Sequence, residues 1–413
     1  MKDAPRTDVL IHLEPLQAGR ALLRFKLLTS GATKDFVLHD VDRRIQAIND
    51  DLPHLLQEFR IAVSPPGTVQ LDAARMTKAF DRLKWLAYGM LDLLLEQSDC
   101  SPARFVTSLS AFLTPVTIAS GKRNGAPPVI ELSADDAFPL AWHLPLELIP
   151  LVQSADATAP RKPGAASPND FLAYLGMSAV IVRRRRPDGE ASREKASKTP
   201  LSVVAFRGNS VLPGIEAQLS YFRSKTALID AHTLWPGDDP PDECDAVSEL
   251  ADILLQPQKS RSAPDSPRPV VHFCCHYRAG GAGALAELEV SDGLGVRIVD
   301  LRGALAQHEV PDATVAGLPL VFLNACTSAS LNPRDDSLLR LLIRRGYCHV
   351  IGGETLLPDR IAGEFATRVY RDALRGRPIG MAIWRARRYL LERFNNPGGL
   401  LYTLYGSPDI RLH

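Results

Sequence analysis

Apolar residues occupy every second position, or more, in two short runs within the first 30 residues of the chain. The segments 9–13 and 21–28 place apolar side chains at every second position, and the Gln-Ala-Gly-Arg segment at 17–20 separates them. Alternation with a period of two is typical of a strand with one buried face, and a short glycine-containing segment between two such runs predicts a turn. We therefore expect a β-hairpin at this end of the chain.

The pattern changes to a helical period after residue 40. Apolar residues recur three or four positions apart in two long segments, 40–59 and 71–97. This spacing places the apolar side chains on one face of a helix. The sequence predicts two helices that form an antiparallel pair and bury their apolar faces.

From residue 127 onward, short apolar runs alternate with amphipathic segments. The expected strands are 127–132, 179–182, 201–206, 226–235, 271–276, 321–326 and 348–351. The expected helices open at 212 and cover 249–255, 299–308, 336–345, 360–375 and 379–394. Short, uniformly apolar runs are typical of strands buried on both faces, and their alternation with helices is typical of a parallel sheet. The predicted fold class is α/β, a mostly parallel sheet flanked by helices, with a smaller α+β lobe at the N-terminus.

Two of the buried runs end in reactive side chains. Residues 271–276 are Val-His-Phe-Cys-Cys-His, and residues 321–326 are Val-Phe-Leu-Asn-Ala-Cys. Sites in open α/β sheets form at the carboxyl ends of strands, so two neighbouring strands would bring His276 and Cys326 to the same edge. An imidazole that takes the thiol proton leaves a thiolate that attacks a carbonyl carbon. The two runs therefore predict nucleophilic catalysis by a cysteine.

Composition and charge indicate which partners and which cellular compartment to expect. The chain has 413 residues and a net charge of +1, which argues against a nucleic acid as the main partner. Its apolar runs are too short to cross a membrane, and its first residues lack the apolar segment of a signal peptide. Six cysteines without framework spacing fit a reducing compartment. We therefore expect a cytoplasmic protein with neither nucleic acid nor membrane as a partner.

Five segments together resemble the CHAT family, which comprises caspase-like cysteine peptidases related to separases. The run at 271–276 resembles the family's strand that ends in Cys-His, and Asn-Ala-Cys-Thr at 324–327 resembles its Ser-Ala-Cys-Glu-Thr segment. The other three segments are Leu-Pro-Leu-Glu at 144–147, Leu-Pro-Gly-Ile-Glu-Ala at 212–217 and Leu-Tyr-Gly-Ser-Pro-Asp at 404–409. The five segments follow one another in the family's order, so we expect a caspase-like fold.

The resemblance implies a role for each residue of the dyad. His276 would be the general base and Cys326 the nucleophile, while the backbone N–H groups of Cys326 and Tyr277 would bind the oxyanion. The chain departs from the family where Tyr277 replaces the usual Gly and Thr327 the usual Glu. Tyr277 keeps a backbone N–H but restricts φ and ψ. These departures bear on efficiency and specificity more than on the dyad itself.

The resemblance also implies a preference for a basic residue before the scissile bond. Glu354 and Asp359 are the candidate carboxylates of a pocket that binds Arg. The loop that begins at Arg207 would form the opposite wall. Asp359 has a second interpretation, because a carboxylate at this position also suits the cap of a helix that begins near 361.

The expected mechanism requires neither a metal nor another cofactor. His272, Cys274 and His276 would share one face of a strand, so a metal site is an alternative interpretation of these residues. Three ligands on one strand fit a tetrahedral ion poorly, which disfavours that alternative.

The predicted organisation places the dyad in the second part of the chain. Residues 1–125 form a regulatory or structural lobe, and 126–413 form the CHAT region, divided into a pseudo-lobe at 126–200 and a catalytic lobe at 201–413. The predicted function is a cysteine endopeptidase that cleaves a partner protein. The resemblance implies a bacterial defence or cell-death system, an activating protein partner and a gasdermin-like substrate as one candidate.

Two other functions fit the same residues. One is a catalytically silent caspase-like interaction or scaffold module, for which Tyr277 is the main support. The other is a regulatory thiol sensor that uses Cys326. The basic run at 183–186 is interpreted as a solvated strand end, with an acidic-partner site or a self-cleavage site as the alternatives.

Overall fold

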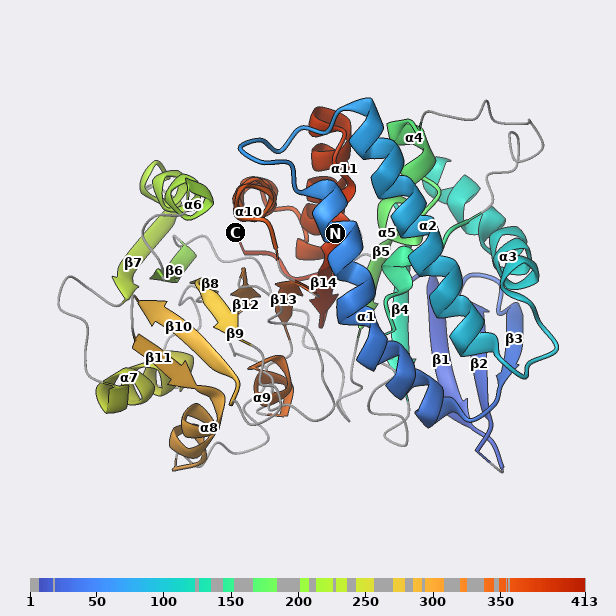
Figure 1. Cartoon of the computed structure of the whole chain (residues 1–413), viewed down its shortest axis with the longest axis horizontal. Helices are drawn as coiled ribbons and strands as arrows, with labels where there is room; N and C mark the ends of the chain where they lie inside the picture. The colour runs from blue at the N-terminus through green and yellow to red at the C-terminus, as the bar shows by residue number, and fades with distance from the viewer. Residues whose placement is uncertain are drawn as a thin grey trace. The chain divides into compact units, whose positions relative to one another are not determined.

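The computed structural model describes most of the chain. The described residues are 7–17, 19–122, 126–134, 144–151, 166–183, 201–207, 213–225, 228–235, 243–255, 270–278, 285–291, 294–307, 320–324, 338–344, 349–353, 355 and 357–412. Contacts divide the chain into two compact units. Unit 1 comprises Met1–Arg186 and Ile383–Leu400, and unit 2 comprises Pro187–Ala382 and Leu401–His413. The chain is coloured from one end to the other in Figure 1.

Unit 1 is built on strands in the order β3-β2-β1-β4-β5. These strands are β1 (Val9–Pro15), β2 (Ala21–Leu27), β3 (Thr33–Leu38), β4 (Val129–Ala134) and β5 (Val180–Arg183). The first three form an antiparallel meander, which confirms the predicted hairpin and extends it by one strand. Strands β1, β4 and β5 then run parallel, with Val9 opposite Ile130 and Ile130 opposite Ile181.

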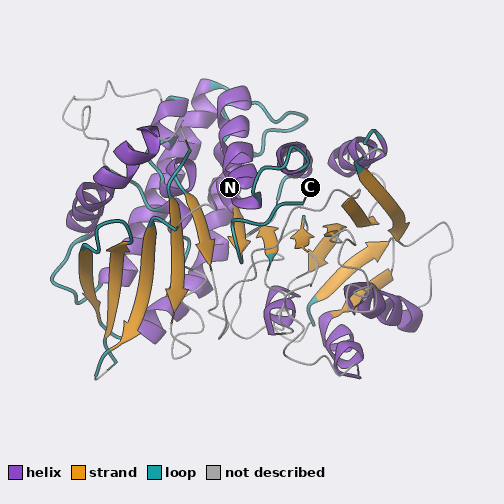
Figure 2. Cartoon of the chain, turned by 180° about the vertical axis from the view of Figure 1, so that it is seen from behind, coloured by secondary structure: helices purple, strands orange, loops and turns teal. Residues whose placement is uncertain are grey.

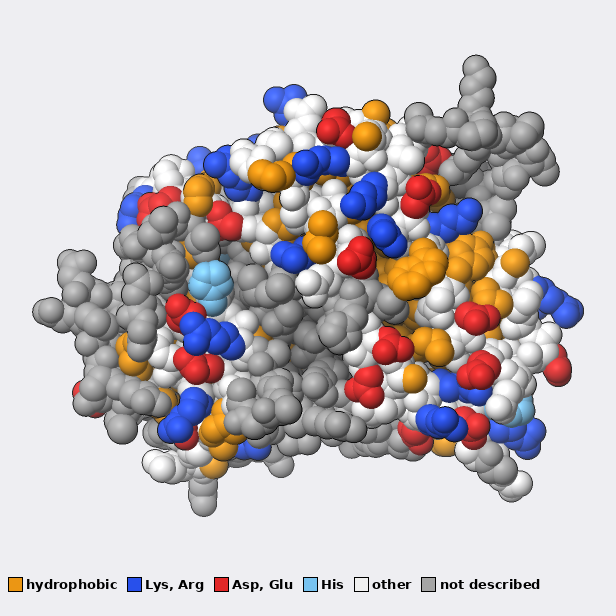
Figure 3. All heavy atoms as spheres, in the orientation of Figure 1, with side chains coloured by type: hydrophobic (Ala, Val, Ile, Leu, Met, Phe, Trp, Pro, Cys, Tyr) orange, Lys and Arg blue, Asp and Glu red, His pale blue; other side chains and the backbone are white. Residues whose placement is uncertain are grey.

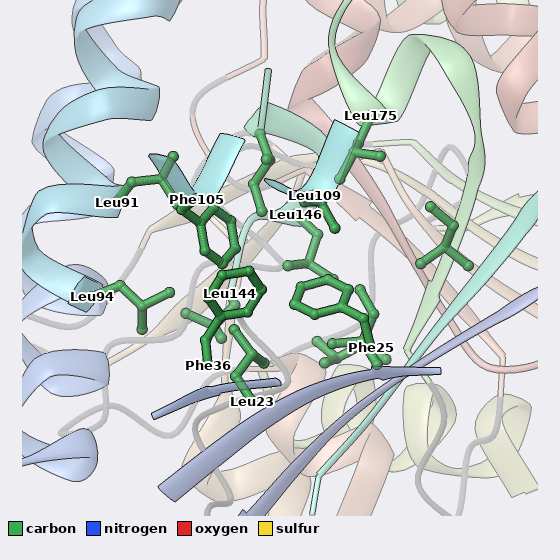
Figure 4. Close-up of a cluster of buried hydrophobic side chains, with 14 of the residues drawn as sticks. Leu23, Phe25, Phe36, Leu91, Leu94, Phe105, Leu109, Leu144, Leu146 and Leu175 are labelled. Carbon is green, nitrogen blue, oxygen red and sulfur yellow. The ribbon is translucent and has the colours of Figure 1, made fainter. Parts of the chain in front are cut away.

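Long helices supply the other half of the core of unit 1. They are α1 (Val41–Val63), α2 (Ala73–Leu95) and α3 (Pro102–Lys122), with the short helices η2 (Leu146–Leu148), α4 (Pro168–Phe171) and α5 (Leu175–Ser178). Apolar side chains of α1, α2 and α3 share one core with the strands. Figure 4 shows Leu91 and Leu94 of α2 and Phe105 of α3 beside Phe25 and Phe36. The Phe36 and Phe105 rings lie 4.5 Å apart. The two helices predicted at 40–97 are confirmed.

A cluster of three charged residues lies in the interior of unit 1. Arg183 donates two hydrogen bonds to the Glu147 carboxylate, at 2.7 and 2.6 Å, and one to the Leu144 carbonyl oxygen at 2.7 Å. Arg387 lies 3.4 Å from the same carboxylate and donates to the Gly176 carbonyl oxygen at 3.1 Å. The three side chains are at most 2% exposed. We call Glu147, Arg183 and Arg387 the charged cluster.

The charged cluster corrects the expectation of a solvated strand end at Arg183. The Arg183 guanidinium is buried because Glu147, from the Leu-Pro-Leu-Glu segment, neutralises it. Burial opposes the charge of Glu147, but Arg183 and Arg387 outweigh that effect and lower the pKa of Glu147. Residues 184–186 lie outside the described residues.

Unit 2 contains the mostly parallel sheet, in the order β14-β13-β12-β8-β6-β7. Its strands are β6 (Leu201–Arg207), β7 (Ile229–Trp235), β8 (Val270–Cys274), β12 (Leu320–Leu323), β13 (Val350–Gly353) and β14 (Tyr402–Tyr405). Only β13 and β14 pair antiparallel among the described strands of this sheet. The predicted α/β class with a mostly parallel sheet is therefore confirmed.

Helices cover both faces of the unit 2 sheet, as the predicted fold requires. They are α6 (Pro213–Arg223), α7 (Glu243–Leu255), α8 (Ile298–Gln307), α9 (Leu338–Arg344) and α10 (Asp359–Ala373). Val271 and Phe273 of β8 face the core formed with α7, α8 and α9. His272, between them, contacts Tyr370 of α10 and Gln218 of α6 on the other face. Helix α11 (Ile379–Phe394) and η5 (Pro397–Leu401) precede β14. Figure 2 shows the helices and strands from behind.

A small antiparallel sheet was not predicted. It has the order β11-β10-β9 and consists of β9 (His276–Arg278), β10 (Glu287–Ser291) and β11 (Leu294–Arg297). The strand predicted at 271–276 is present, but its predicted end is wrong. Strand β8 stops at Cys274, the chain bends at Cys275, and His276 begins β9. The chain leaves the parallel sheet here because β9 pairs with β10.

The described surface mixes acidic and basic side chains, as Figure 3 shows on one face. No described helix is both long enough and apolar enough to cross a membrane.

Candidate active site

His276 lies at the point where the chain passes from the parallel sheet of unit 2 to the small antiparallel sheet. It is the first residue of β9 and is half-buried. Its register partner in β10 is Glu289, whose carboxylate accepts a hydrogen bond from Arg278 at 2.6 Å. The backbone of β8 and β9 thus places the imidazole just beyond the carboxyl end of β8, where α/β sheets form their sites.

Cys326 itself lies outside the described residues, and Asn324 is the last described residue before it. Strand β12, which leads to it, is the direct parallel neighbour of β8. Phe322 lies opposite His272, and Leu323 lies opposite Phe273, so the paired residues of β8 face the residues 50 positions later. His276 and Cys326 are separated by the same 50 positions in the sequence.

Tyr277, which stands where the family usually has Gly, is accommodated without backbone strain. It lies in extended β9 and is not among the described residues with positive φ. Its side chain is 4% exposed and belongs to the core formed with α7, α8 and α9. Cys275 belongs to the same core, as expected for a packing residue. The bulk of Tyr277 is therefore directed into the apolar interior of unit 2.

Of the three candidate pocket residues, Asp359, Arg207 and Glu354, the structure describes the side chain of Asp359 alone. Asp359, the first residue of α10, accepts a hydrogen bond from the Gly214 backbone N–H at 2.6 Å, so its carboxylate holds the first turn of α6. Arg207 is the last residue of β6, opposite Cys274 in register, and its side chain is not described. Glu354 lies outside the described residues. The assignment of the three to a pocket stays a prediction.

Beneath the strand ends lies a buried, uncharged hydrogen-bond network that the sequence did not predict. His272 bonds Gln218 Oε1 through Nε2 at 2.7 Å and the Tyr370 hydroxyl through Nδ1 at 3.0 Å. Asn324 donates to Gln218 Oε1 at 2.8 Å and accepts from the Tyr402 hydroxyl. We call the following residues the neutral network: Gln218, His272, Cys274, Asn324, Tyr370 and Tyr402. Polar residues on the apolar face of α6 and at the end of β12 were the available signals.

Burial keeps the titratable members of this network uncharged. It lowers the pKa of His272 to about 3 and raises the pKa of the Cys274 thiol and of the Tyr370 hydroxyl. With a pKa of about 3, His272 is too weak a base to take a proton from a thiol near neutral pH, and its Nδ1 already accepts from Tyr370. A protonated, buried Cys274 is a poor nucleophile. His272 and Cys274 are therefore unsuited to be the general base and the nucleophile of this site.

The alternative metal site finds no support at His272. Both ring nitrogens already have protein partners. The described residues contain no group of three or more His, Cys, Asp or Glu side chains able to hold a metal ion.

Comparison with known proteins places the chain in a family. The family model described as "CHAT domain" matches residues 142–397, more than half of the chain. The chain belongs to the CHAT-domain family. This membership supports a caspase-like cysteine peptidase scaffold, and the match includes both His276 and Cys326. The division into lobes at residues 125 and 200 stays a prediction.

Among solved structures, two of the Saccharomyces cerevisiae separase–securin complex are similar to this CHAT-domain chain. Each is 12% identical and covers 96% of this chain, with TM-scores of 0.46 and 0.43. The chain spans 30% of the length of the matched separase chains. The search of curated proteins returned no match.

Proposed function

We propose that the chain is a cysteine endopeptidase in which Cys326 is the nucleophile and His276 the general base. The observation that carries the proposal is the register of β8 and β12. These strands are parallel neighbours with an offset of 50 residues, and the same offset separates His276 from Cys326. The family match over both residues supports it.

The proposed reaction is an acyl transfer in two steps. His276 takes the thiol proton, and the Cys326 thiolate attacks the peptide carbonyl carbon to form a tetrahedral oxyanion. The backbone N–H groups of Cys326 and Tyr277 stabilise this oxyanion. His276 then gives the proton to the leaving amine, and water hydrolyses the resulting thioester to release the acid and the free thiol. The chemistry needs neither a metal nor a cofactor.

The proposed substrate is a protein cut after a basic residue. Asp359 is the described candidate for the carboxylate that pairs with Arg or Lys, and its charge acts on Cys274 at the end of β8. Glu354, and the loop after Arg207 on the other side, complete the proposed pocket. Within a bacterial defence or cell-death system in the cytoplasm, an activating protein partner would switch on the cleavage of a target such as a gasdermin-like protein.

A peptide library tests the proposal. The purified full chain is mixed with fluorogenic peptides that differ in the residue before the cut bond, beside Cys326→Ala and His276→Ala. Cys100→Ala and His39→Ala are matched controls, because both residues lie in unit 1. Cleavage after Arg or Lys that both dyad variants lose, and both controls keep, supports the proposal.

Other outcomes divide the alternatives. Cleavage after Asp or a large apolar residue keeps the dyad and excludes the acidic pocket. Cleavage that survives in Cys326→Ala excludes the proposed nucleophile. Reversible oxidation of Cys326 without any cleavage would favour the thiol sensor.

A further inference from the structure

Gln218 of α6 is buried with its amide held in one orientation. Its Nε2 donates to the Gly214 carbonyl oxygen, one helical turn earlier, at 2.9 Å. The side chain is 2% exposed. Because that carbonyl oxygen can only accept a hydrogen bond, the NH2 group faces it, and Oε1 faces the sheet.

The Oε1 atom of Gln218 contacts the ends of both strands that lead to the proposed dyad. Asn324 Nδ2 donates to it at 2.8 Å, and the Cys274 thiol lies 3.5 Å away. Cys274 precedes His276 by two residues, and Asn324 precedes Cys326 by two residues. One amide oxygen thus joins the equivalent positions before the general base and before the nucleophile.

The neighbours of Gln218 restrict its movement and that of Asn324. His272 Nε2 also bonds Oε1, and since Oε1 only accepts, the ring proton lies on Nε2 and Nδ1 accepts from the Tyr370 hydroxyl. Asn324 Oδ1 accepts from the Tyr402 hydroxyl, and its Nδ2 also approaches the Ala362 carbonyl oxygen at 3.3 Å. Buried polar networks in which each member is satisfied are rigid.

Helix α6 is held against α10 at the same level. A Cβ atom on Gly214 would lie 2.2 Å from the Asp359 carbonyl oxygen, and one on Gly363 would lie 2.8 Å from the Gly214 carbonyl oxygen. Only glycine permits this approach. The amide of Gln218 is therefore carried on a helix whose first turn cannot shift toward or away from α10 without a clash or a gap.

We propose that Gln218 is a positioning residue that sets the separation of His276 and Cys326 by holding Cys274 and Asn324 on one amide oxygen. This inference rests on the proposed function. Gln218 does not touch the reacting atoms; it fixes the two backbone segments from which they extend. Removal of Oε1 would remove the side-chain link between Cys274 and Asn324, which lie one residue beyond the last paired residues, Phe273 and Leu323.

Alkylation of Cys326 measures this coupling without a known substrate. Iodoacetamide reacts with the thiolate, which displaces iodide to form a thioether. Its rate at Cys326 is measured by mass spectrometry of the full chain at about pH 6 and about pH 9. A thiol paired with His276 reacts nearly as fast at the lower pH, whereas Cys100, which lies in unit 1, reports an unpaired thiol in the same sample.

The variants separate positioning from folding. Gln218→Met keeps the volume but removes both hydrogen-bonding groups, and we expect the pH 6 rate at Cys326 to fall at least about tenfold. Ser220→Met, on the exposed face of α6, is the matched control and should leave the rate unchanged. Gln218→Glu restores the amide geometry only when protonated, so its rate relative to the original chain should rise as the pH falls, an effect that a merely structural role would not produce.

The outcomes distinguish the inference from the proposed function. If His276→Ala lowers the pH 6 rate while folded Gln218→Met keeps it within about twofold, the positioning role is overturned. If Cys326 behaves like Cys100 in the original chain and His276→Ala changes nothing, the proposed function fails instead. If Gln218→Met does not fold, Gln218→Glu decides alone: a relative rate independent of pH overturns the inference.

Discussion

Two buried polar clusters of this chain link segments that are distant in the sequence, one through charged groups and the other through uncharged groups. In unit 1, the charged cluster joins η2, β5 and α11 through two guanidinium groups and one carboxylate. In unit 2, the neutral network joins α6, β8, β12, α10 and β14 through amide, imidazole and hydroxyl groups. Both connect segments that are distant in the sequence, and both are closed to solvent.

The difference between the two clusters shows that buried charges are tolerated where each has an oppositely charged partner. An ion cluster is stable only while all its members are present, because a lone buried charge is costly. A neutral network has a smaller penalty for each lost partner. It also places no formal charge directly beneath the strand ends that carry His276 and lead to Cys326.

The largest expected effect comes from breaking the charged cluster. Glu147→Gln leaves two buried guanidinium groups without a carboxylate, so we expect the free energy of unfolding of unit 1 to fall by about 3–5 kcal/mol. Chemical denaturation measures it. Glu58→Gln is the control, because Glu58 forms an exposed ion pair with Arg82 and such pairs contribute little. Equal losses in the two variants would show that the charged cluster does not hold unit 1 together.

A smaller loss should follow from separating the helices that frame the neutral network. Gly214→Ala places a methyl group 2.2 Å from the Asp359 carbonyl oxygen, so α6 must shift, at a cost of about 3 kcal/mol. Gly303→Ala in α8 has open space around the new Cβ and should be neutral or stabilising. Thermal unfolding compares the two. A Gly214→Ala chain as stable as the original would mean that α6 is free to move.

Acid should affect the neutral network before the charged cluster. Unfolded His272 binds a proton below about pH 6.5, whereas burial lowers its folded pKa to about 3, so stability falls by about 1.4 kcal/mol per pH unit as the pH drops through that window. The folded pKa of Glu147 is lowered instead, so its contribution is lost only in more acidic solution. His272→Gln should flatten the decline between about pH 6.5 and pH 5, as measured by denaturation at several pH values. An unchanged slope would contradict a neutral, buried His272.

The smallest effect on stability is expected at Asp359. Asp359→Asn keeps the shape of the side chain but weakens the bond to the Gly214 N–H, with a loss of about 1 kcal/mol. In the peptide library, the same variant should reduce cleavage after Arg and Lys more than cleavage after neutral residues. Glu364→Gln, later in α10, is the matched control. An unchanged preference for basic residues would remove Asp359 from the pocket and leave it only its bond to the first turn of α6.

Periodic segments were predictable from the sequence because the pattern itself records which face is buried. Helices α1 and α2 and most strands of unit 2 follow from their apolar spacing. Helix α3 was missed because Ser, Thr and an internal Pro115 weaken its helical character, and packing of Phe105 and Leu109 in the core overrides that preference. Strands β3, β10, β11 and β14 were missed because they are short, and several contain charged residues. Such segments show little alternation of apolar and polar positions.

The candidate site was predictable only in part. His276 and Cys326 were recognisable from residue type and spacing, but the end of β8 at Cys274 depends on pairing between β9 and β10. The roles of Gln218 and Tyr402 could not be predicted, because their contacts join residues 54 to 106 positions apart. The burial of Arg183 likewise depends on Glu147, 36 positions earlier.

Affinity labelling tests the central claim most directly. A peptide acyloxymethyl ketone with Arg at its reactive end is added to the full chain, to His276→Ala and to the heat-unfolded chain, and each cysteine is read by mass spectrometry. The account predicts that Cys326 is labelled completely and ahead of Cys100 in the folded chain, and that His276→Ala and unfolding both abolish this selectivity. Labelling of Cys326 at the same rate as Cys100 in all three samples would contradict a His276–Cys326 dyad.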